Sequence, residues 1–366
     1  MTRWQSVPFH TLFRRVPKRT GFPAEELLSV YREYGVIRKS DRDDNFNRPG
    51  NLNDYQLVKT GDLVLNKMKA WQGALGISPH TGIVSPAYFV YTPVSDNDES
   101  FLHYALRCRD AIDYYAAHST GIRVNQWDVS PERLDAMPVP VPDLATQRRI
   151  ADYLDKEISE MDALIEEFEG LVASLESRQR VFATKLVQNC DYPLVPLSTL
   201  VSVVSGDSIE SDFIKAEGKF PVYGGNGIRG YTDSSNCDVE RILVGRQGAL
   251  CGNVHLAKPD FFATEHALIV KPRQEVDLVW LEHTLRELNL GELSTSVAQP
   301  GITATKVLLQ RVKLPPIREQ RRIGRILQDE TARMDSLIEE STRLIENLKA
   351  RKTALITEVV TGRKEV

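Results

Sequence analysis

The sequence predicts an α+β protein built as a pseudo-twofold tandem repeat, in which two similar α/β segments are separated by two long antiparallel coiled-coil helices. Two repeated passages predict this fold. Gln-Arg-Arg-Ile at 147–150 and Met-Asp-Ala-Leu-Ile-Glu-Glu at 161–167 return in the same register at 320–323 and 334–340. Earlier in each half, Val-Pro-Phe-His-Thr-Leu at 7–12 is echoed by Val-Pro-Leu-Ser-Thr-Leu at 195–200. Each half is therefore a globular segment followed by a long helix.

The repeat divides the chain into four segments. Its 366 residues suit two or three domains, and the repeat resolves that expectation into two halves. We expect a first globular domain at 1–142, a first helix at 143–190, a second globular domain at 191–314 and a second helix at 315–366. The proline-rich stretches 138–142 and 315–316 stop the preceding chain as extended structure before each helix.

Apolar residues in both helical segments step by three and four, which is the seam of a coiled coil. A helix of about 40 residues is about 60 Å long. Two independent helices, each covering its own domain, are the alternative; we favour antiparallel pairing, because pseudo-twofold symmetry lets identical seams meet and would hold the globular segments at a fixed distance. The helix and partner interface is predicted at Ile158, Met161, Ile165, Phe168, Met334, Ile338 and Ile345.

Composition narrows the class of protein. No apolar run approaches the length of a membrane span and the amino terminus lacks a signal pattern, so we expect a cytoplasmic protein with no membrane partner. Cys108, Cys190, Cys237 and Cys251 are scattered, which supports neither a disulfide framework nor a zinc site. The net charge of −4 does not by itself indicate nucleic acid. Any DNA affinity must come from local basic loops or be shared with a partner.

The globular segments share a local pattern with different loop chemistry. Residues 63–65 and 242–244 are strand-like, and each run leads through a polar loop to Gly-Ala-Leu, which a glycine follows directly in the first half and one residue later in the second. Lys and Arg can donate to guanine, and Asn or Gln can bond adenine in both directions. Polar surface residues in turns are the alternative at any single position. The predicted DNA-binding residues are Lys67, Lys69, Gln72, Arg123, Asn125, Gln126, Asn226, Arg229, Arg246, Gln247 and Gln299.

Catalytic and cofactor motifs are missing from the sequence. Residues 225–230 match Gly-x-Gly-x-x-Gly, but a turn-rich stretch follows where a dinucleotide site needs a helix, so we interpret them as a glycine-rich turn presenting Asn226 and Arg229. There is no Walker loop, no His-Glu-x-x-His, no nucleophile elbow and no Asn-Pro-Pro-Tyr, and the histidines are dispersed. We therefore predict no catalytic residue, no metal and no cofactor in this chain.

Three features of the sequence are typical of a known family: Pro-x-x-x-x-Gln-Arg-Arg-Ile at Pro142 and Pro315, the Met-Asp-x-Leu-Ile-Glu-Glu block in both helices, and Tyr-Gly-Gly-Asn-Gly-Ile at 223–228. Through these features the chain resembles, over essentially its whole length, the specificity subunit of Type I restriction-modification systems.

The resemblance implies a non-catalytic subunit with two target-recognition domains, each reading half of a bipartite site in double-stranded DNA. It further implies that the two helices set the spacer and dock two modification subunits, which carry the S-adenosylmethionine chemistry, and that a restriction subunit can join them. Two alternatives stay open: a coiled-coil scaffold that binds only proteins, and the DNA-recognition part of a split methyltransferase or restriction enzyme.

Overall fold

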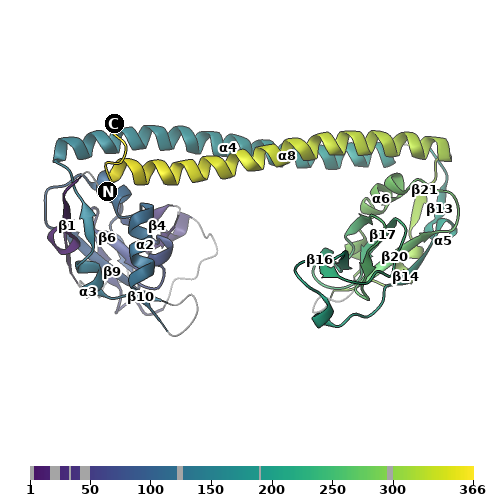
Figure 1. The fold of residues 1–366 in the computed structure, drawn as a ribbon, viewed down its shortest axis with the longest axis horizontal. Helices are drawn as coiled ribbons and strands as arrows, with labels where there is room; N and C mark the ends of the chain where they lie inside the picture. Colours follow the sequence, from purple (N-terminus) through teal and green to yellow (C-terminus); the bar gives the residue numbers. More distant parts are fainter. Residues whose placement is uncertain are drawn as a thin grey trace. The chain divides into compact units, whose positions relative to one another are not determined.

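A computed structural model of the chain describes residues 4–16, 25–32, 34–41, 50–121, 127–188, 191–294 and 300–366. The chain divides into two compact units (Figure 1). Unit 1 combines Met1–Phe168 with Arg343–Val366, and unit 2 is Glu169–Thr342. Each unit therefore holds one β-rich globular part and a stretch of each of the two long helices, α4 (Leu144–Gln188) and α8 (Ile317–Val360).

The globular part of unit 1 is made of short strands and short helices. Its strands are β1 (Ser6–Pro8), β2 (Phe13–Arg15), β3 (Leu28–Tyr31), β4 (Gly35–Arg38), β5 (Gln56–Val58), β6 (Leu63–Asn66), β7 (Leu75–Ile77), β8 (Gly82–Val84), β9 (Tyr88–Pro93), β10 (Ser119–Thr120), β11 (Asp128–Val129) and β12 (Pro138–Pro140). Its helices are α1 (Glu99–Ala105), α2 (Arg109–His118) and α3 (Pro131–Asp135), with 3-10 turns η1 (Phe9–Thr11), η2 (Lys39–Asp41) and η3 (Ala70–Gln72).

The globular part of unit 2 has the same character. Its strands are β13 (Leu194–Pro196), β14 (Val201–Ser205), β15 (Phe220–Gly224), β16 (Gly227–Thr232), β17 (Arg241–Gly245), β18 (Val254–Ala257), β19 (Phe262–Ala263), β20 (Ala267–Pro272) and β21 (Arg311–Lys313). Its helices are α5 (Leu197–Leu200), α6 (Leu278–Arg286) and α7 (Ala304–Leu308), with 3-10 turns η4 (Ser211–Phe213) and η5 (Leu290–Leu293).

The two units repeat one sheet topology. In unit 1 the four-stranded sheet has the order β2-β9-β6-β7, and in unit 2 the corresponding order is β14-β20-β17-β18, with all neighbours antiparallel. A separate two-stranded pair joins the start and end of each globular part, β1 with β12 and β13 with β21. Unit 2 adds a three-stranded sheet, β16-β15-β19. The strands that follow the sequence echo at 7–12 and 195–200 thus occupy equivalent places.

The long helices run antiparallel within each unit. In unit 1, Lys352 of α8 donates to both carboxylate oxygens of Asp162 of α4 at 2.7 Å, whereas Arg149, earlier on α4, donates to the carbonyl of Val366, beyond α8. In unit 2, Gln179 of α4 donates to Asp335 of α8 at 3.0 Å, and the later Val187 shares a core with the earlier Ile323. The predicted α+β fold with two β-rich domains and paired long helices is confirmed.

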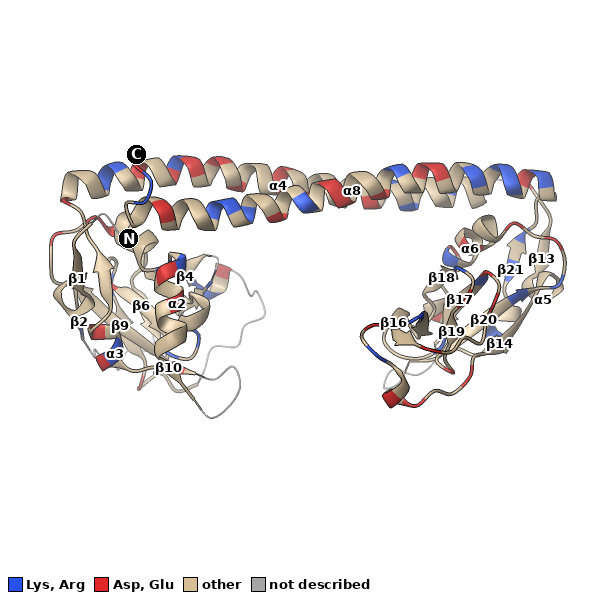
Figure 2. Ribbon diagram, in the orientation of Figure 1, with Lys and Arg blue, Asp and Glu red and all other residues tan. Residues whose placement is uncertain are grey.

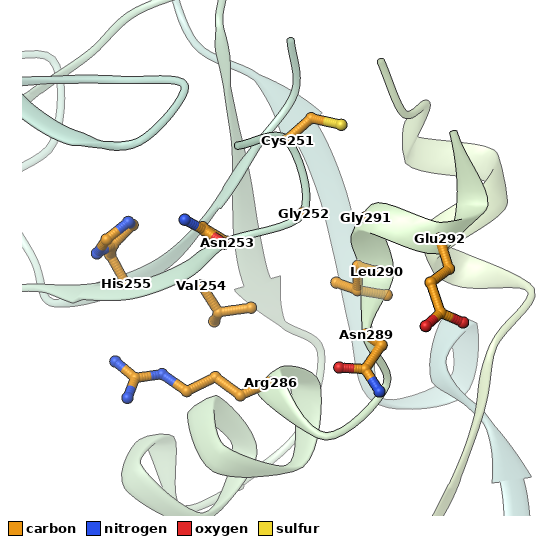
Figure 3. Close-up of a pocket in the computed structure, with 10 residues that line it drawn as sticks. All are labelled: Cys251, Gly252, Asn253, Val254, His255, Arg286, Asn289, Leu290, Gly291 and Glu292. Carbon is orange, nitrogen blue, oxygen red and sulfur yellow. The ribbon is translucent and has the colours of Figure 1, made fainter. Parts of the chain in front are cut away.

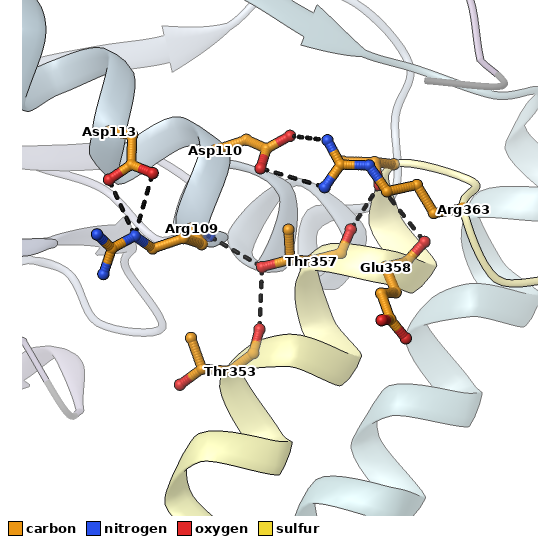
Figure 4. Close-up of polar contacts among 8 residues, drawn as sticks. Arg109, Asp110, Asp113, Thr353, Thr357, Glu358 and Arg363 are labelled. Atoms are coloured by element: carbon orange, nitrogen blue, oxygen red, sulfur yellow. Dashed lines mark hydrogen bonds and ion pairs between the residues drawn. The ribbon is translucent and has the colours of Figure 1, made fainter. Parts of the chain in front are cut away.

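The core of unit 1 takes residues from both ends of the chain. Buried residues of the sheet, such as Leu65 and Tyr91, pack in one cluster with Leu154 and Met161 of α4 and with α8 residues 355, 359 and 360. Polar contacts follow the same route (Figure 4). Arg363 forms a two-pronged pair with Asp110 at the start of α2, and the amide of Arg109 donates to the Thr357 hydroxyl at 3.0 Å. The final stretch of the chain therefore completes the first globular part.

Candidate nucleic-acid interface

The loop after β6 in unit 1 is a rigid turn. Asn66 ends the strand, and its side-chain oxygen accepts from the amide of Met68 at 3.1 Å. Trp71, within η3, donates its indole N–H back to the carbonyl of Met68 at 3.0 Å. These bonds hold Lys69 at the surface and leave Gln72 half-buried at the end of η3. Local side-chain to backbone bonds of this kind replace ladder bonds where a strand ends.

Lys67 and Arg246 occupy equivalent places in the two units. The amide of Lys67 donates to the carbonyl of Ala87, and the amide of Arg246 donates to the carbonyl of His266, each at the turn before the paired strand, β9 or β20. The side chains repeat the correspondence: Lys67 Nζ donates to the Pro86 carbonyl at 2.5 Å, and Arg246 Nη1 donates to the Glu265 carbonyl at 3.3 Å. The duplication therefore places one cation at the same point of each sheet.

The surroundings of the two cations differ. Lys67 lies 4.8 Å from the ring centroid of Phe89, and burial followed by the charge of Arg15 lowers its pKa. Arg246 donates a second time from Nη1, to the Ser205 hydroxyl at 3.1 Å. Arg has five N–H donors in a fixed fork, so donors beyond Nη1 remain for a ligand.

Unit 2 brings the glycine-rich turn against the Arg246 loop. Gly225 and Asn226 form the two-residue turn between β15 and β16, because Gly224 pairs with Gly227. A Cβ atom built on Gly245 would lie 1.9 Å from the Gly225 carbonyl oxygen, so only glycine permits this approach. The sequence motif at 225–230 is thus a β-hairpin, and it gathers the predicted residues of unit 2 at one end of the sheet.

The predicted side chains at this end of unit 2 have identified neighbours. Asn226 accepts from Asn253 at 2.6 Å, and Gln247 Oε1 lies 2.8 Å from Nδ1 of His266. Arg229 is exposed on β16, one residue beyond the exposed Ile228. Amide, imidazole and guanidinium groups therefore lie together at this surface, with the Glu265 carboxylate 3.4 Å from His266 Nε2. The arrangement offers both donors and acceptors to a polar ligand.

Two tryptophans beside the unit 1 loop were not predicted from the sequence as part of the site. Trp71 packs against Trp127 with ring centroids 5.1 Å apart, and both rings are half-buried. Because Trp127 precedes the short β11 strand, this pair joins segments distant in the chain. The sequence does place two of the chain's four tryptophans beside polar loops, and this was the signal that could have indicated them. The predicted residues Arg123, Asn125, Gln126 and Gln299 lie outside the described residues.

A cavity of about 550 Å³ opens beside the same region of unit 2 (Figure 3). Figure 3 shows Arg286 and His255 on one side and Asn289 and Glu292 on the other. Arg286 is paired with Glu282 at 2.7 Å, and burial lowers the pKa of His255, which keeps its ring neutral at pH 7. Asn253, another lining residue, holds the hairpin through Asn226. The cavity is a polar recess that supports the hairpin.

Two of the predicted helix-interface residues, Ile158 and Met161, share a core cluster with Leu355 and Val359 of α8. Ile158, Met161, Ile165, Met334 and Ile345 are buried, and Phe168 and Ile338 are half-buried.

Three of the four arginines in the repeated pairs near the helix starts have partners within the chain. Arg321 pairs with Glu275, Arg322 pairs with Glu319 at 2.6 Å, and Arg149 donates to the Val366 carbonyl at 3.0 Å. Carboxylates within unit 2 thus account for the arginines at the positive end of α8.

Three observations bear on other kinds of site. Within the described ranges, no group of three or more His, Cys, Asp or Glu side chains could hold a metal ion. None of the described helices is long and apolar enough to cross a membrane. Cys108, Cys237 and Cys251 are free thiols. The polar loops at one end of each repeated sheet are the candidate site, and the fold defines a protein with two globular parts of one design.

Comparisons with known proteins relate parts of this chain to one family. Residues 191–347 match the family model for the Type I restriction modification DNA specificity domain. The chain is 38% identical over 140 residues to the Type I restriction enzyme EcoprrI specificity subunit of Escherichia coli, covering 38% of this chain and 34% of that one. It is 24% identical over 158 residues to the putative specificity subunit S.HindORF215P of Haemophilus influenzae, covering 42% of this chain and 41% of that one. These matches thus span well under half of the relatives' own lengths.

Solved structures share the fold along nearly the whole chain. A chain from a study of complex assembly and conformational transition of the type I R-M system superposes with a TM-score of 0.74 at 17% identity, covering 98% of this chain and 97% of that one. The HsdS subunit of Thermoanaerobacter tengcongensis gives 0.53 at 16% identity, covering 99% and 97%. The family model thus accounts for residues 191–347, and the solved structures show that the chain shares their fold.

Proposed function

We propose that this chain is the DNA-specificity subunit of a Type I restriction-modification system, and that it reads a bipartite site in double-stranded DNA without catalytic activity of its own. The observation that carries the proposal is the repeated loop. Lys67 and Arg246 are fixed by equivalent carbonyl bonds in two sheets of the same order, yet their neighbours differ. A common scaffold with different loop chemistry suits the reading of two different half-sites.

In this proposal each unit reads one half-site with the side chains at the loop end of its sheet. Unit 1 uses Lys67, Lys69 and Gln72, and unit 2 uses Asn226, Arg229, Arg246 and Gln247. Amides and guanidiniums can make the bidentate contacts that distinguish base pairs in the major groove. Arg123, Asn125, Gln126 and Gln299 are further proposed DNA contacts, on the evidence of the sequence alone.

The domain division follows from the same proposal. Residues 1–142 and 191–314 are target-recognition domains, and 143–190 and 315–366 are spacer helices that set the distance between half-sites. The paired seams support this role, because a helix packed along its length against a partner resists bending better than one alone. In unit 1 the contact of Lys352 with Asp162 fixes the register of that pairing.

Partners are inferred from charge and from exposed apolar residues. The net charge of −4, with basic and acidic residues interspersed along both helices (Figure 2), supports DNA being enclosed jointly with other subunits. Leu164 and its repeat equivalent Leu337 are 44% and 50% exposed within the duplicated Met-Asp-x-Leu-Ile-Glu-Glu block. The same apolar residue displayed twice suits two copies of one partner. We assign these positions to two modification subunits, which carry the S-adenosylmethionine chemistry; a restriction subunit joins the complex.

A binding profile over variants of the target site tests the proposal. The chain, assembled with its modification subunits, is measured against a library in which each base pair is varied. Gln72→Ala should relax positions in one half-site and Gln247→Ala positions in the other, each by about 1 to 3 kcal/mol for a bidentate contact. Gln274→Ala is the matched control, because Gln274 is exposed beyond the opposite end of β20.

Three outcomes would contradict the proposal. Both substitutions altering the same half-site would remove the division of labour between units. If a substitution weakened binding evenly over all DNA sequences, and the slope of log affinity against log salt concentration became smaller by about one, the side chain would contact a phosphate and not a base. Methyl transfer or DNA cleavage by the chain alone would contradict the absence of catalytic activity.

A further inference from the structure

Gln147 and Gln320, the first residues of the repeated Gln-Arg-Arg-Ile motif, make the same pair of buried hydrogen bonds in the two units. Each lies in the first turn of its long helix, and they are 2% and 3% exposed. Gln147 Nε2 donates to the carbonyl of Pro142 at 2.9 Å, and Gln320 Nε2 donates to that of Pro315 at 2.8 Å. Their side-chain oxygens face a different element, α1 in unit 1 and α6 in unit 2.

Each glutamine oxygen completes the N-terminal cap of that helix. Gln147 Oε1 accepts from the amide of Asp98 at 2.9 Å, and Gln320 Oε1 accepts from the amide of Asp277 at 3.1 Å. Asp98 is the N-cap of α1 and Asp277 the N-cap of α6, and each carboxylate accepts from the amide three residues on. A capping box would return a Glu or Gln side chain from that third position to the N-cap amide.

The third position holds a core aromatic instead. Phe101 in α1 and Trp280 in α6 are fully buried, so neither can supply the returning acceptor. The glutamine of the long helix supplies this acceptor instead. The N-cap of α1 or α6 is therefore also the place where the long helix is attached to the globular part. In unit 2 the approach is so close that a Cβ atom on Gly324, one turn after Gln320, would lie 2.3 Å from Asp277 Oδ1.

We propose that Gln147 and Gln320 are positioning residues that hold each recognition domain at a fixed angle to its spacer helix, and so sharpen the preference for one spacer length. The inference rests on the proposed function, since only a bipartite site has a spacer to select. A buried polar group left unpaired is costly, so the two bonds favour one arrangement of helix and globular part over arrangements that break them. Loosening this joint should leave the reading loops intact while blurring the distance between them.

The test uses the full chain assembled with its modification subunits and DNA carrying both half-sites at a series of spacer lengths. Gln147→Met with Gln320→Met keeps side-chain length and removes donor and acceptor. We expect the preference for the best spacer over its neighbours to fall about tenfold, with base preference within each half-site unchanged. Gln147→Glu with Gln320→Glu keeps the acceptor and should fall between. Gln328→Met is the matched control, because Gln328 is an exposed glutamine within the α8 helix, beyond its first turns.

The outcomes separate this inference from the function on which it rests. A double Met variant that binds with the wild-type spacer profile overturns the positioning role, as does a variant that changes base preference instead of spacer preference. If the Met variant fails to fold, the Glu variant decides: a wild-type profile there, with binding retained, also overturns the role. Absence of sequence-specific binding by the wild-type complex at every spacer contradicts the proposed function itself.

Discussion

Replacing Leu355 by alanine should loosen the sheet of unit 1, although Leu355 stands near the far end of the chain. Leu355 is 6% exposed and belongs to the cluster that contains Leu65 of β6. A buried Leu→Ala change removes apolar contact and leaves a cavity, at a cost of about 2 to 5 kcal/mol. Every 1.4 kcal/mol is a factor of ten, so amide exchange that proceeds through opening of this core should speed up by about 30-fold or more.

Hydrogen exchange followed by mass spectrometry measures this effect segment by segment. The decisive peptides cover β6 in unit 1 and β17 in unit 2. Leu344→Ala is the matched control, because Leu344 is on the same helix and in the same unit but is 40% exposed, so its substitution should change stability by at most about 0.5 kcal/mol. Faster exchange in β17 with β6 still protected would refute the reasoning, and so would equal effects of the two substitutions.

Two further predictions concern pH and partner binding. Burial, reinforced by a neighbouring arginine, lowers the pKa of His103 to about 3 and that of His283 to about 4, so below pH 6.5 the unfolded chain binds more protons than the folded chain. The free energy of unfolding, measured with urea, should therefore fall with decreasing pH by at most about 1.4 kcal/mol per pH unit for each histidine. His283→Gln should flatten this slope, and an unaltered slope would contradict the assignment. Leu164→Ser with Leu337→Ser should lower the number of modification subunits bound to each chain, measured by sedimentation. The control Leu309→Ser, at an exposed leucine outside the long helices, should leave that number unchanged. An equal loss of bound subunits in both variants would contradict the proposed docking role.

The long helices could be predicted closely because their signals are local. Steps of three and four, bounded by prolines, predicted a first helix within 143–190, and the structure has Leu144–Gln188. The correspondence between residues 63–65 and 242–244 also agrees with the structure, since β6 and β17 hold the same place in their sheets. The internal repeat made this possible, because a residue pattern found in both halves of the chain indicates that the two segments have the same structural surroundings.

The bonding of the candidate site could not be predicted, because it depends on contacts between distant segments. Lys67 and Arg246 were singled out for their donors, yet the carbonyls that accept from them belong to residues 86 and 265, before other strands. Gln147 was noticed as part of a repeat, but its partner Asp98 is on another helix. No residue spacing along the chain encodes such pairs.

The composition of unit 1 has a consequence for biosynthesis. Unit 2 is contiguous, Glu169–Thr342, and its core draws on residues 183–327, so the ribosome has released everything this core requires before the end of α8 is translated. Unit 1 waits for residues 343–366, which supply Leu355, Val359 and Val360 to its core. Domains generally mature in the order of synthesis. In this chain the order is reversed: unit 1, which is begun first, is completed after unit 2, and a frameshift before residue 355 would damage the core around the amino-terminal sheet.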